Sequence, residues 1–166
     1  ASVQAEIEKN CGEYIPDVKE FRTDNKDFLL KQIYEATERR FSIIRYLMKN
    51  KEWDFFMFVE MGTDRIQHAM WQFHDKTHRK HDPNSKYKNV LLDYYKYLDK
   101  LIGDVVDLLP KNTNVIVISD HGAKKMEGCI NINDWLIENG YLKLNKTPDK
   151  VTRIKDDMVD WNNTTA

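Results

Sequence analysis

Two uninterrupted apolar runs stand out in a chain whose other apolar residues are spaced among charged ones. Phe55 to Val59 is rich in aromatic residues, and Val115 to Ile118 consists only of β-branched residues. Runs of this length without polar alternation are typical of strands buried on both faces, as in a parallel sheet covered by helices. The pattern therefore predicts two strands, over residues 53–61 and 114–119.

Helical spacing accounts for most of the other apolar positions. An apolar stripe that recurs every three or four residues predicts a helix over 27–49, with Asp24 or Asn25 as its N-terminal cap. The same spacing predicts a long helix over 85–109, with Ser85 as its cap. The remaining elements are short, and we expect three helices and one strand, over residues 3–9, 64–74, 135–139 and 141–144 respectively.

The order of these elements favours an α/β fold. Two helices separate the strand at 53–61 from the strand at 114–119, and a parallel strand pair needs a helical crossover of this kind. We expect helices packed on a partial, mainly parallel sheet within a single domain over 1–166. Residues 145–166 are charged and contain Pro148, so we expect a poorly structured or incomplete tail there.

Composition narrows the possible partners. The chain has 166 residues, of which 41% are hydrophobic and 32% charged, and its net charge is −1. A net charge this close to zero gives no overall positive electrostatic field that would attract nucleic acid or anionic lipid. No apolar stretch approaches the length needed to span a membrane. Cys11 and Cys129 match no metal-binding spacing, so we expect two reduced thiols and a cytoplasmic protein.

Candidate chemistry lies where the two predicted strands end. Asp120 and His121 directly follow the second strand, while Asp64 and His68 follow the first strand at the four-residue spacing that places both on one helix face. The carboxyl ends of parallel strands lie on one edge of a sheet, so the two pairs should meet. Carboxylate and imidazole together suit Zn²⁺, Mn²⁺ or Fe²⁺, which predicts a divalent metal site.

Each of these residues also has a plain structural interpretation. Asp64 would be favourable in the first turn of a helix whatever its chemistry, and His68 could be a partly buried helix residue. Asp120 and His121 could belong to an ordinary loop after a strand. Four ligands would also leave two ions short of the number that two-metal phosphate enzymes usually provide. The histidine-rich stretch 74–83 is expected to be a solvated loop, from which His78 could reach substrate.

Three blocks in this sequence resemble the alkaline phosphatase superfamily, and most closely its type I phosphodiesterase/nucleotide pyrophosphatase branch. The resemblance covers roughly residues 12–145 and is specific because the blocks occur in order. They are Phe58-Val-Glu-Met-Gly-Thr-Asp-Arg-Ile-Gln-His68, Val117-Ile-Ser-Asp-His-Gly-Ala123 and Asn131-Ile-Asn-Asp-Trp-Leu-Ile-Glu-Asn-Gly-Tyr-Leu142.

The resemblance implies an alkaline-phosphatase-like fold and a hydrolase of phosphate mono- and diesters that acts on small phosphate-ester or nucleotide substrates. It implies two divalent ions, Zn or Mn, in the complete enzyme. Asp64 and His68 would serve one ion, and Asp120 and His121 the other. The family also uses an N-terminal block with an Asp ligand and a Thr or Ser nucleophile, and a C-terminal block with a last His ligand. Neither block is recognised here.

This chain therefore resembles the central fragment of a family member, and we expect it to be inactive alone, with no catalytic residue of its own. Thr63 is expected to cap its helix and Ser119 to end a strand, so neither is a favoured nucleophile. A Ser-Asp-His triad over 119–121 is excluded because neighbouring residues cannot line up in relay. The alternative function is a non-catalytic α/β interaction or structural module that retains the scaffold.

Overall fold

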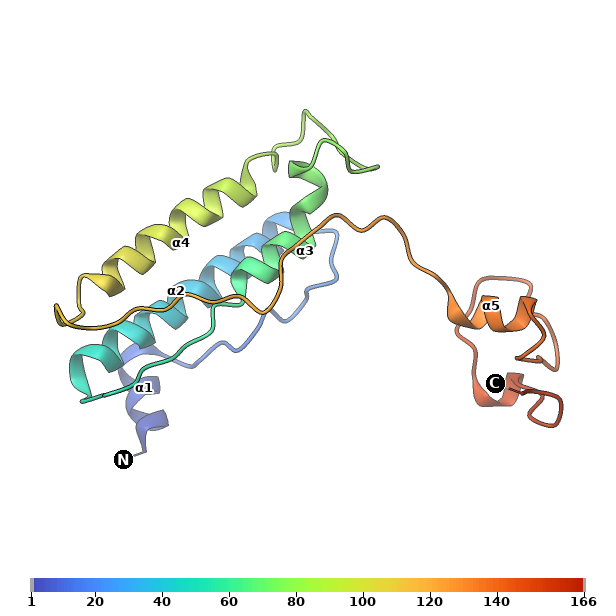
Figure 1. The fold of residues 1–166 in the computed structure, drawn as a ribbon, viewed down its shortest axis with the longest axis horizontal. Coiled ribbons are helices and arrows are strands. Elements are labelled where there is room, and N and C mark those ends of the chain that lie inside the picture. The colour runs from blue at the N-terminus through green and yellow to red at the C-terminus, as the bar shows by residue number, and fades with distance from the viewer. Residues whose placement is uncertain (1, 166) are drawn as a thin grey trace. The chain divides into compact units, whose positions relative to one another are not determined.

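A computed structural model describes residues 2–165 and divides the chain into two compact units, one ending at Lys125 and the other beginning at Met126. The first unit contains four helices, which are α1 (Val3–Cys11), α2 (Lys26–Asn50), α3 (Gly62–His74) and α4 (Val90–Val106). The second unit contains α5 (Ile132–Glu138) and the 3-10 turn η1 (Asp156–Met158) (Figure 1).

The helices of the first unit follow the predicted periodicity closely. Asn25 caps α2 as expected, because its side-chain oxygen accepts a hydrogen bond of 3.1 Å from the backbone N–H of Phe28. Helix α4 begins later than predicted. Ser85 accepts a bond from the backbone N–H of Tyr87 within a run of turns, so the helix starts at Val90 instead.

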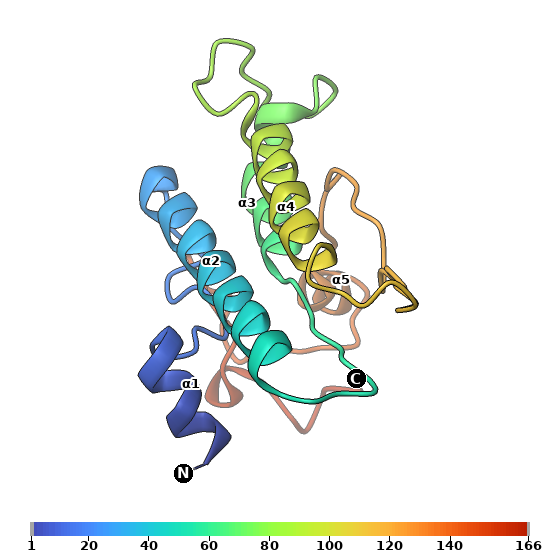
Figure 2. The same ribbon diagram turned by 90° about the vertical axis from the view of Figure 1, so that its left-hand side faces the viewer.

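The core of the first unit lies between three helices. Helix α3 packs against both α2 and α4. Figures 1 and 2 show that α2 and α4 are long helices. Eleven buried apolar residues form one cluster that draws on all three helices. They are Leu29, Ile33, Phe41, Ile44, Ile66, Met70, Leu91, Tyr94, Leu98, Leu101 and Val105.

The predicted α/β fold with a mainly parallel sheet is wrong. No strand forms anywhere in residues 2–165. The one β-bridge within these residues is an isolated antiparallel bridge between Leu144 and Val159. The segments 53–61 and 114–119, expected as buried parallel strands, form no strand. The segment 141–144 likewise forms no strand beyond that bridge.

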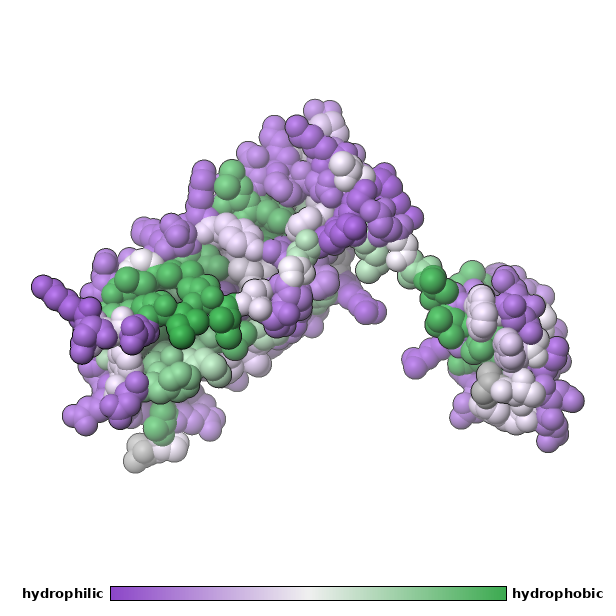
Figure 3. Space-filling model, in the orientation of Figure 1, coloured by the Kyte–Doolittle hydropathy of each residue, from purple (hydrophilic) through white to green (hydrophobic). Residues whose placement is uncertain are grey.

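The predicted sheet does not form because the apolar runs have no neighbouring strand, in the part of the chain that the structure describes, to which their backbone groups could bond. Val115 to Ile118 make no backbone hydrogen bond within the described chain, and their side chains are 56–84% exposed. Helices satisfy their own backbone groups, whereas a strand depends on a neighbour for its hydrogen bonds. Here the helices bury each other's apolar faces and leave the run 115–118 at the surface, together with the run 55–59 apart from Phe56, which packs against the core. Figure 3 shows apolar side chains gathered on the face of the first unit over which 114–119 run.

The second unit is organised around α5. Gly140 takes the left-handed conformation (φ 78°) after this helix, and the backbone N–H of Tyr141 then bonds back to the carbonyl of Leu136 at 2.9 Å. The ring of Tyr141 stacks on Trp135, with ring centroids 5.9 Å apart. Among the described residues 126–165, Leu142 and Val159 are the buried apolar side chains.

Two further properties follow from the described part of the chain. Cys11 and Cys129 are free thiols in this structure. Among residues 2–165, no helix has both the length and the apolar character needed to cross a membrane.

Candidate functional site

The first turns of α3 present Asp64 and His68 together. Their side chains stand one helical turn apart on the same face, and Asp64 Oδ1 lies 3.2 Å from His68 Nε2. The helix begins at Gly62, two residues earlier than predicted, so Thr63 is not its N-terminal cap. The Thr63 hydroxyl instead donates to the backbone carbonyl of Glu60 at 3.3 Å.

The second pair follows the extended segment 114–119. His121 Nε2 lies 3.6 Å from Asp120 Oδ2, while His121 Nδ1 lies 2.9 Å from the carbonyl oxygen of Gly122. A carbonyl can only accept, so Nδ1 carries a proton, and in the neutral ring Nε2 then keeps a free lone pair. This hydrogen bond to Gly122, together with the nearby carboxylates of Asp120 and Asp64, raises the pKa of His121 above its ordinary value.

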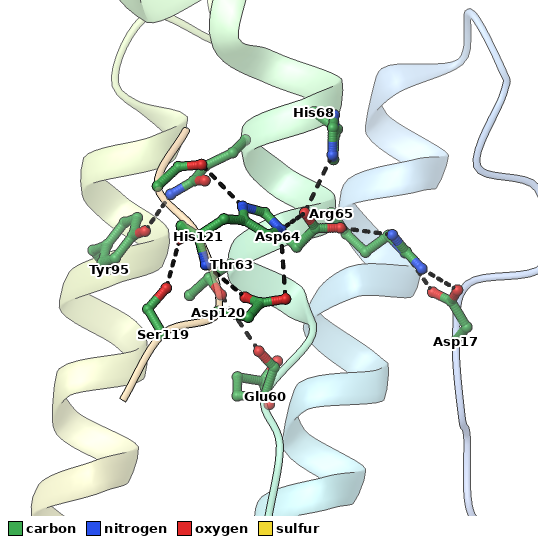
Figure 4. A network of polar contacts seen from close by, with 12 residues as sticks. Asp17, Glu60, Thr63, Asp64, Arg65, His68, Tyr95, Ser119, Asp120 and His121 are labelled. Carbon is green, nitrogen blue, oxygen red and sulfur yellow. Dashed lines mark hydrogen bonds and ion pairs between the residues drawn. The ribbon is translucent and has the colours of Figure 1, made fainter. Parts of the chain in front are cut away.

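The two pairs meet in space (Figure 4). His121 Nε2 lies 4.0 Å from the same Asp64 oxygen that faces His68. The sheet from which we expected this meeting is absent, yet the meeting occurs, because the segment after Ile118 passes the N-terminal end of α3. Asp64 is thus the residue that the two imidazoles share.

Carboxylate and imidazole are donor types that divalent cations bind. Two ligands bound tetrahedrally to one Zn²⁺ have donor atoms about 3.4 Å apart; the separations of 3.2 and 3.6 Å are near this value, and the separation of 4.0 Å is longer. Within residues 2–165, however, no three His, Cys, Asp or Glu side chains form a set that could hold a metal ion. Any ion bound here would need water or further ligands to complete its coordination.

Arg65 and Asp17 flank Asp64, and sequence reasoning overlooked both. Arg65 Nη1 donates to Asp64 Oδ2 at 2.7 Å, while Arg65 Nε and Nη2 donate to the two oxygens of Asp17 at 2.8 and 2.6 Å. These bonds lower the pKa of the Asp17 carboxyl and raise that of Arg65. The position of Arg65 next to Asp64 in the sequence is weak evidence that the two side chains interact. Asp17 lies in an irregular stretch, and no sequence pattern there indicates that it lies near Asp64.

A buried polar network holds the start of α3. The carboxylate of Glu60 accepts bonds from the backbone N–H of Gly62 at 2.6 Å and from Arg40 at 2.9 Å. It also accepts at 3.1 Å from each of the hydroxyls of Thr37 and Tyr94. Glu60 therefore ties α2 and α4 to the turn that precedes Asp64, although the sequence placed it inside a strand.

Gly62 is required at this turn because there is no room for a side chain. A Cβ atom there would overlap the Tyr94 hydroxyl and come within 2.6 Å of Glu60 Oε1. Because Gly62 has no side chain, the Glu60 carboxylate can approach its backbone and accept a hydrogen bond from its N–H. This bond fixes the residue at which α3 begins.

The sequence matches the profile of the family described as type I phosphodiesterase/nucleotide pyrophosphatase over residues 4–165. The chain belongs to this family. The match confirms the resemblance drawn from the three sequence blocks. No curated protein and no solved structure matched in the same comparisons. Members of the type I phosphodiesterase/nucleotide pyrophosphatase family act on nucleotide and phosphate-ester substrates and are generally metal-dependent.

The histidine-rich loop of this phosphodiesterase-family chain makes local contacts. His78 Nδ1 accepts from the backbone N–H of Lys80 at 3.1 Å, and His81 Nδ1 lies 3.1 Å from the carbonyl oxygen of Gln72. Lys125 donates to the carbonyl of Thr77 at 3.2 Å, which joins the loop to the stretch that follows His121.

Proposed function

We propose that this chain is part of a metal-dependent hydrolase of phosphate mono- and diesters. In this proposal Asp64 and His68 hold one divalent ion, Zn²⁺ or Mn²⁺, and Asp120 and His121 hold the other. The observation that supports it is the position of Asp64 Oδ1, which lies 3.2 Å from one imidazole nitrogen and 4.0 Å from another that comes from a distant part of the chain.

Divalent ions, when bound, stabilise negative charge on phosphate oxygens during ester cleavage. The chain's own part is to orient the ligands. The four-residue spacing on α3 fixes Asp64 against His68, and the Nδ1 bond to Gly122 turns Nε2 of His121 toward Asp64 and Asp120. A second hydrogen bond of this kind commonly fixes the ring of a metal-binding histidine.

We further propose that the chain alone does not turn over substrate. The hydroxyls of Thr63 and Ser119, which adjoin the proposed ligands in sequence, are already engaged in local bonds. Ser119 Oγ donates to the carbonyl of His121 at 2.6 Å, and Thr63 Oγ1 donates to the carbonyl of Glu60 at 3.3 Å. In this proposal the nucleophile therefore comes from a block outside the 166 residues.

Metal titration tests the proposal. The 166-residue chain should bind Mn²⁺ with micromolar affinity in calorimetry, and Asp64→Ala and Asp120→Ala should each weaken binding at least about tenfold. Asp99→Asn is the matched control, because Asp99 is an exposed carboxylate on α4 that has no place in the proposed site. Equal binding by Asp64→Ala and Asp99→Asn would remove Asp64 from the site.

A non-catalytic interaction or structural module is the second candidate. It is favoured by the openness of the site, since the side chains of Asp120, His68 and His121 are 89%, 61% and 59% exposed. Water competes well for cations at such exposed groups. This candidate is supported if the folded wild-type chain binds no Mn²⁺ at millimolar concentration, and the hydrolase proposal then fails.

A further inference from the structure

Arg65 forms a bridge between two carboxylates beside the candidate site (Figure 4). Its Nε and Nη2 atoms engage Asp17 through two hydrogen bonds, and its remaining Nη1 donates to Asp64 Oδ2 at 2.7 Å. The other Asp64 oxygen, Oδ1, is the one that faces His68 and His121. The two oxygens of Asp64 therefore have different partners.

We propose that Asp17 and Arg65 are positioning residues that hold Asp64 as a single-oxygen metal ligand. The inference rests on the proposed role of Asp64 in binding a divalent ion. Arg65 occupies Oδ2, which keeps that oxygen from turning toward the cation, and Asp17 fixes the plane of the guanidinium. The two parallel bonds to Asp17 matter because a planar fork held at two points cannot rotate away from Asp64.

The surroundings of Arg65 support a fixed orientation. The ring of Phe21 lies under the guanidinium, with 5.4 Å between the ring centroid and the central carbon, and the same ring meets the edge of His68 at 6.4 Å. Asp17 also accepts a 2.8 Å bond from the backbone N–H of Val18, so its carboxylate is held at a second point. The loop before α2 is thus attached to the face of α3 that carries Asp64.

Charge and positioning predict opposite effects when Arg65 is neutralised. Asp17, Arg65 and Asp64 together carry one negative charge, and Arg65→Gln raises this to two. Electrostatics alone would then make a divalent cation bind more tightly. Loss of orientation predicts weaker binding, because removing the group that orients a metal ligand typically costs about 10- to 100-fold in affinity. The sign of the change separates the two effects.

The experiment measures Mn²⁺ affinity by calorimetry and the visible spectrum of bound Co²⁺ for the full 166-residue chain. Arg65→Gln should bind Mn²⁺ about tenfold more weakly, and its Co²⁺ absorption should fall if Asp64 begins to bind through both oxygens and raises the coordination number. Asp17→Asn should shift both readouts in the same direction by less, because asparagine keeps one acceptor for Arg65. Arg45→Gln is the matched control, since Arg45 pairs with Glu38 on α2.

The outcomes separate this inference from the proposed function. If Asp64→Ala abolishes binding while Arg65→Gln binds Mn²⁺ as tightly as wild type or more so, the positioning role is wrong and the metal site stands. If Asp64→Ala binds like wild type, the proposed function fails and the inference fails with it. Should Arg65→Gln not fold by circular dichroism, Arg65→Lys replaces it, because lysine keeps the charge but lacks the fork and should still weaken binding.

Discussion

Glu60→Gln tests the network that ties the start of α3 to α2 and α4. Glutamine has almost the shape of glutamate and keeps an acceptor for the hydroxyls and for the N–H of Gly62. It removes the negative charge that faces Arg40 at 2.9 Å. The side chains of Arg40 and Glu60 are only 6% and 10% exposed, so solvent screens the pair little.

The expected loss of stability follows from this burial. The desolvation of Arg40 alone would lower its pKa, but the Glu60 carboxylate and, to a smaller extent, Tyr14 more than offset this effect, so the pKa of Arg40 is raised. Without Glu60, Arg40 keeps its interaction with the side chain of Tyr14 and a long hydrogen bond of 3.4 Å to the carbonyl of Pro16. Breaking one side of a buried pair costs about 3–5 kcal/mol, so we expect a loss of about 3 kcal/mol, given that glutamine preserves the other bonds.

Urea denaturation followed by far-ultraviolet circular dichroism measures this change, because the helices of the first unit dominate the signal. Arg45→Gln is the control, since it breaks an exposed pair with Glu38 at the same 2.9 Å distance and should cost less than about 1 kcal/mol. If Glu60→Gln costs no more than Arg45→Gln, the Glu60 network does not stabilise the fold as argued.

Three further predictions concern stability. Gly62→Ala should destabilise the chain by at least about 1–3 kcal/mol in the same denaturation assay, because the added methyl group overlaps the Tyr94 hydroxyl; an unchanged midpoint would contradict this packing. Asp17→Asn should destabilise the chain more at pH 7 than at pH 3, because the bonds from Arg65 lower the pKa of Asp17. The stability that these bonds add is present in full above about pH 4 and is lost as pH falls through the folded-state pKa; equal differences at both pH values would exclude this. Ile116→Lys should change stability by less than about 0.5 kcal/mol, since Ile116 is 82% exposed; a loss of several kcal/mol would show that this segment is buried.

The sequence by itself determined the helices and the local pairs. Helix α2 was predicted to within one residue at each end, and Asn25, one of the two residues predicted as its cap, is the cap. The meeting of Asp64 with His68 follows from their four-residue spacing alone. These features were predictable because a helix forms its hydrogen bonds between residues four apart, so its apolar stripe, its cap and its side-chain neighbours are all encoded locally.

Only the tertiary structure decided what the apolar runs do and what surrounds Asp64. The run 115–118 reads as a buried strand, but a strand needs a partner from elsewhere in the chain, and within the described residues it has none. The link from Asp17 to Arg65 and the 4.0 Å approach of His121 to Asp64 join segments that are 48 or more residues apart. Such contacts depend on how the helices pack, which no local pattern specifies.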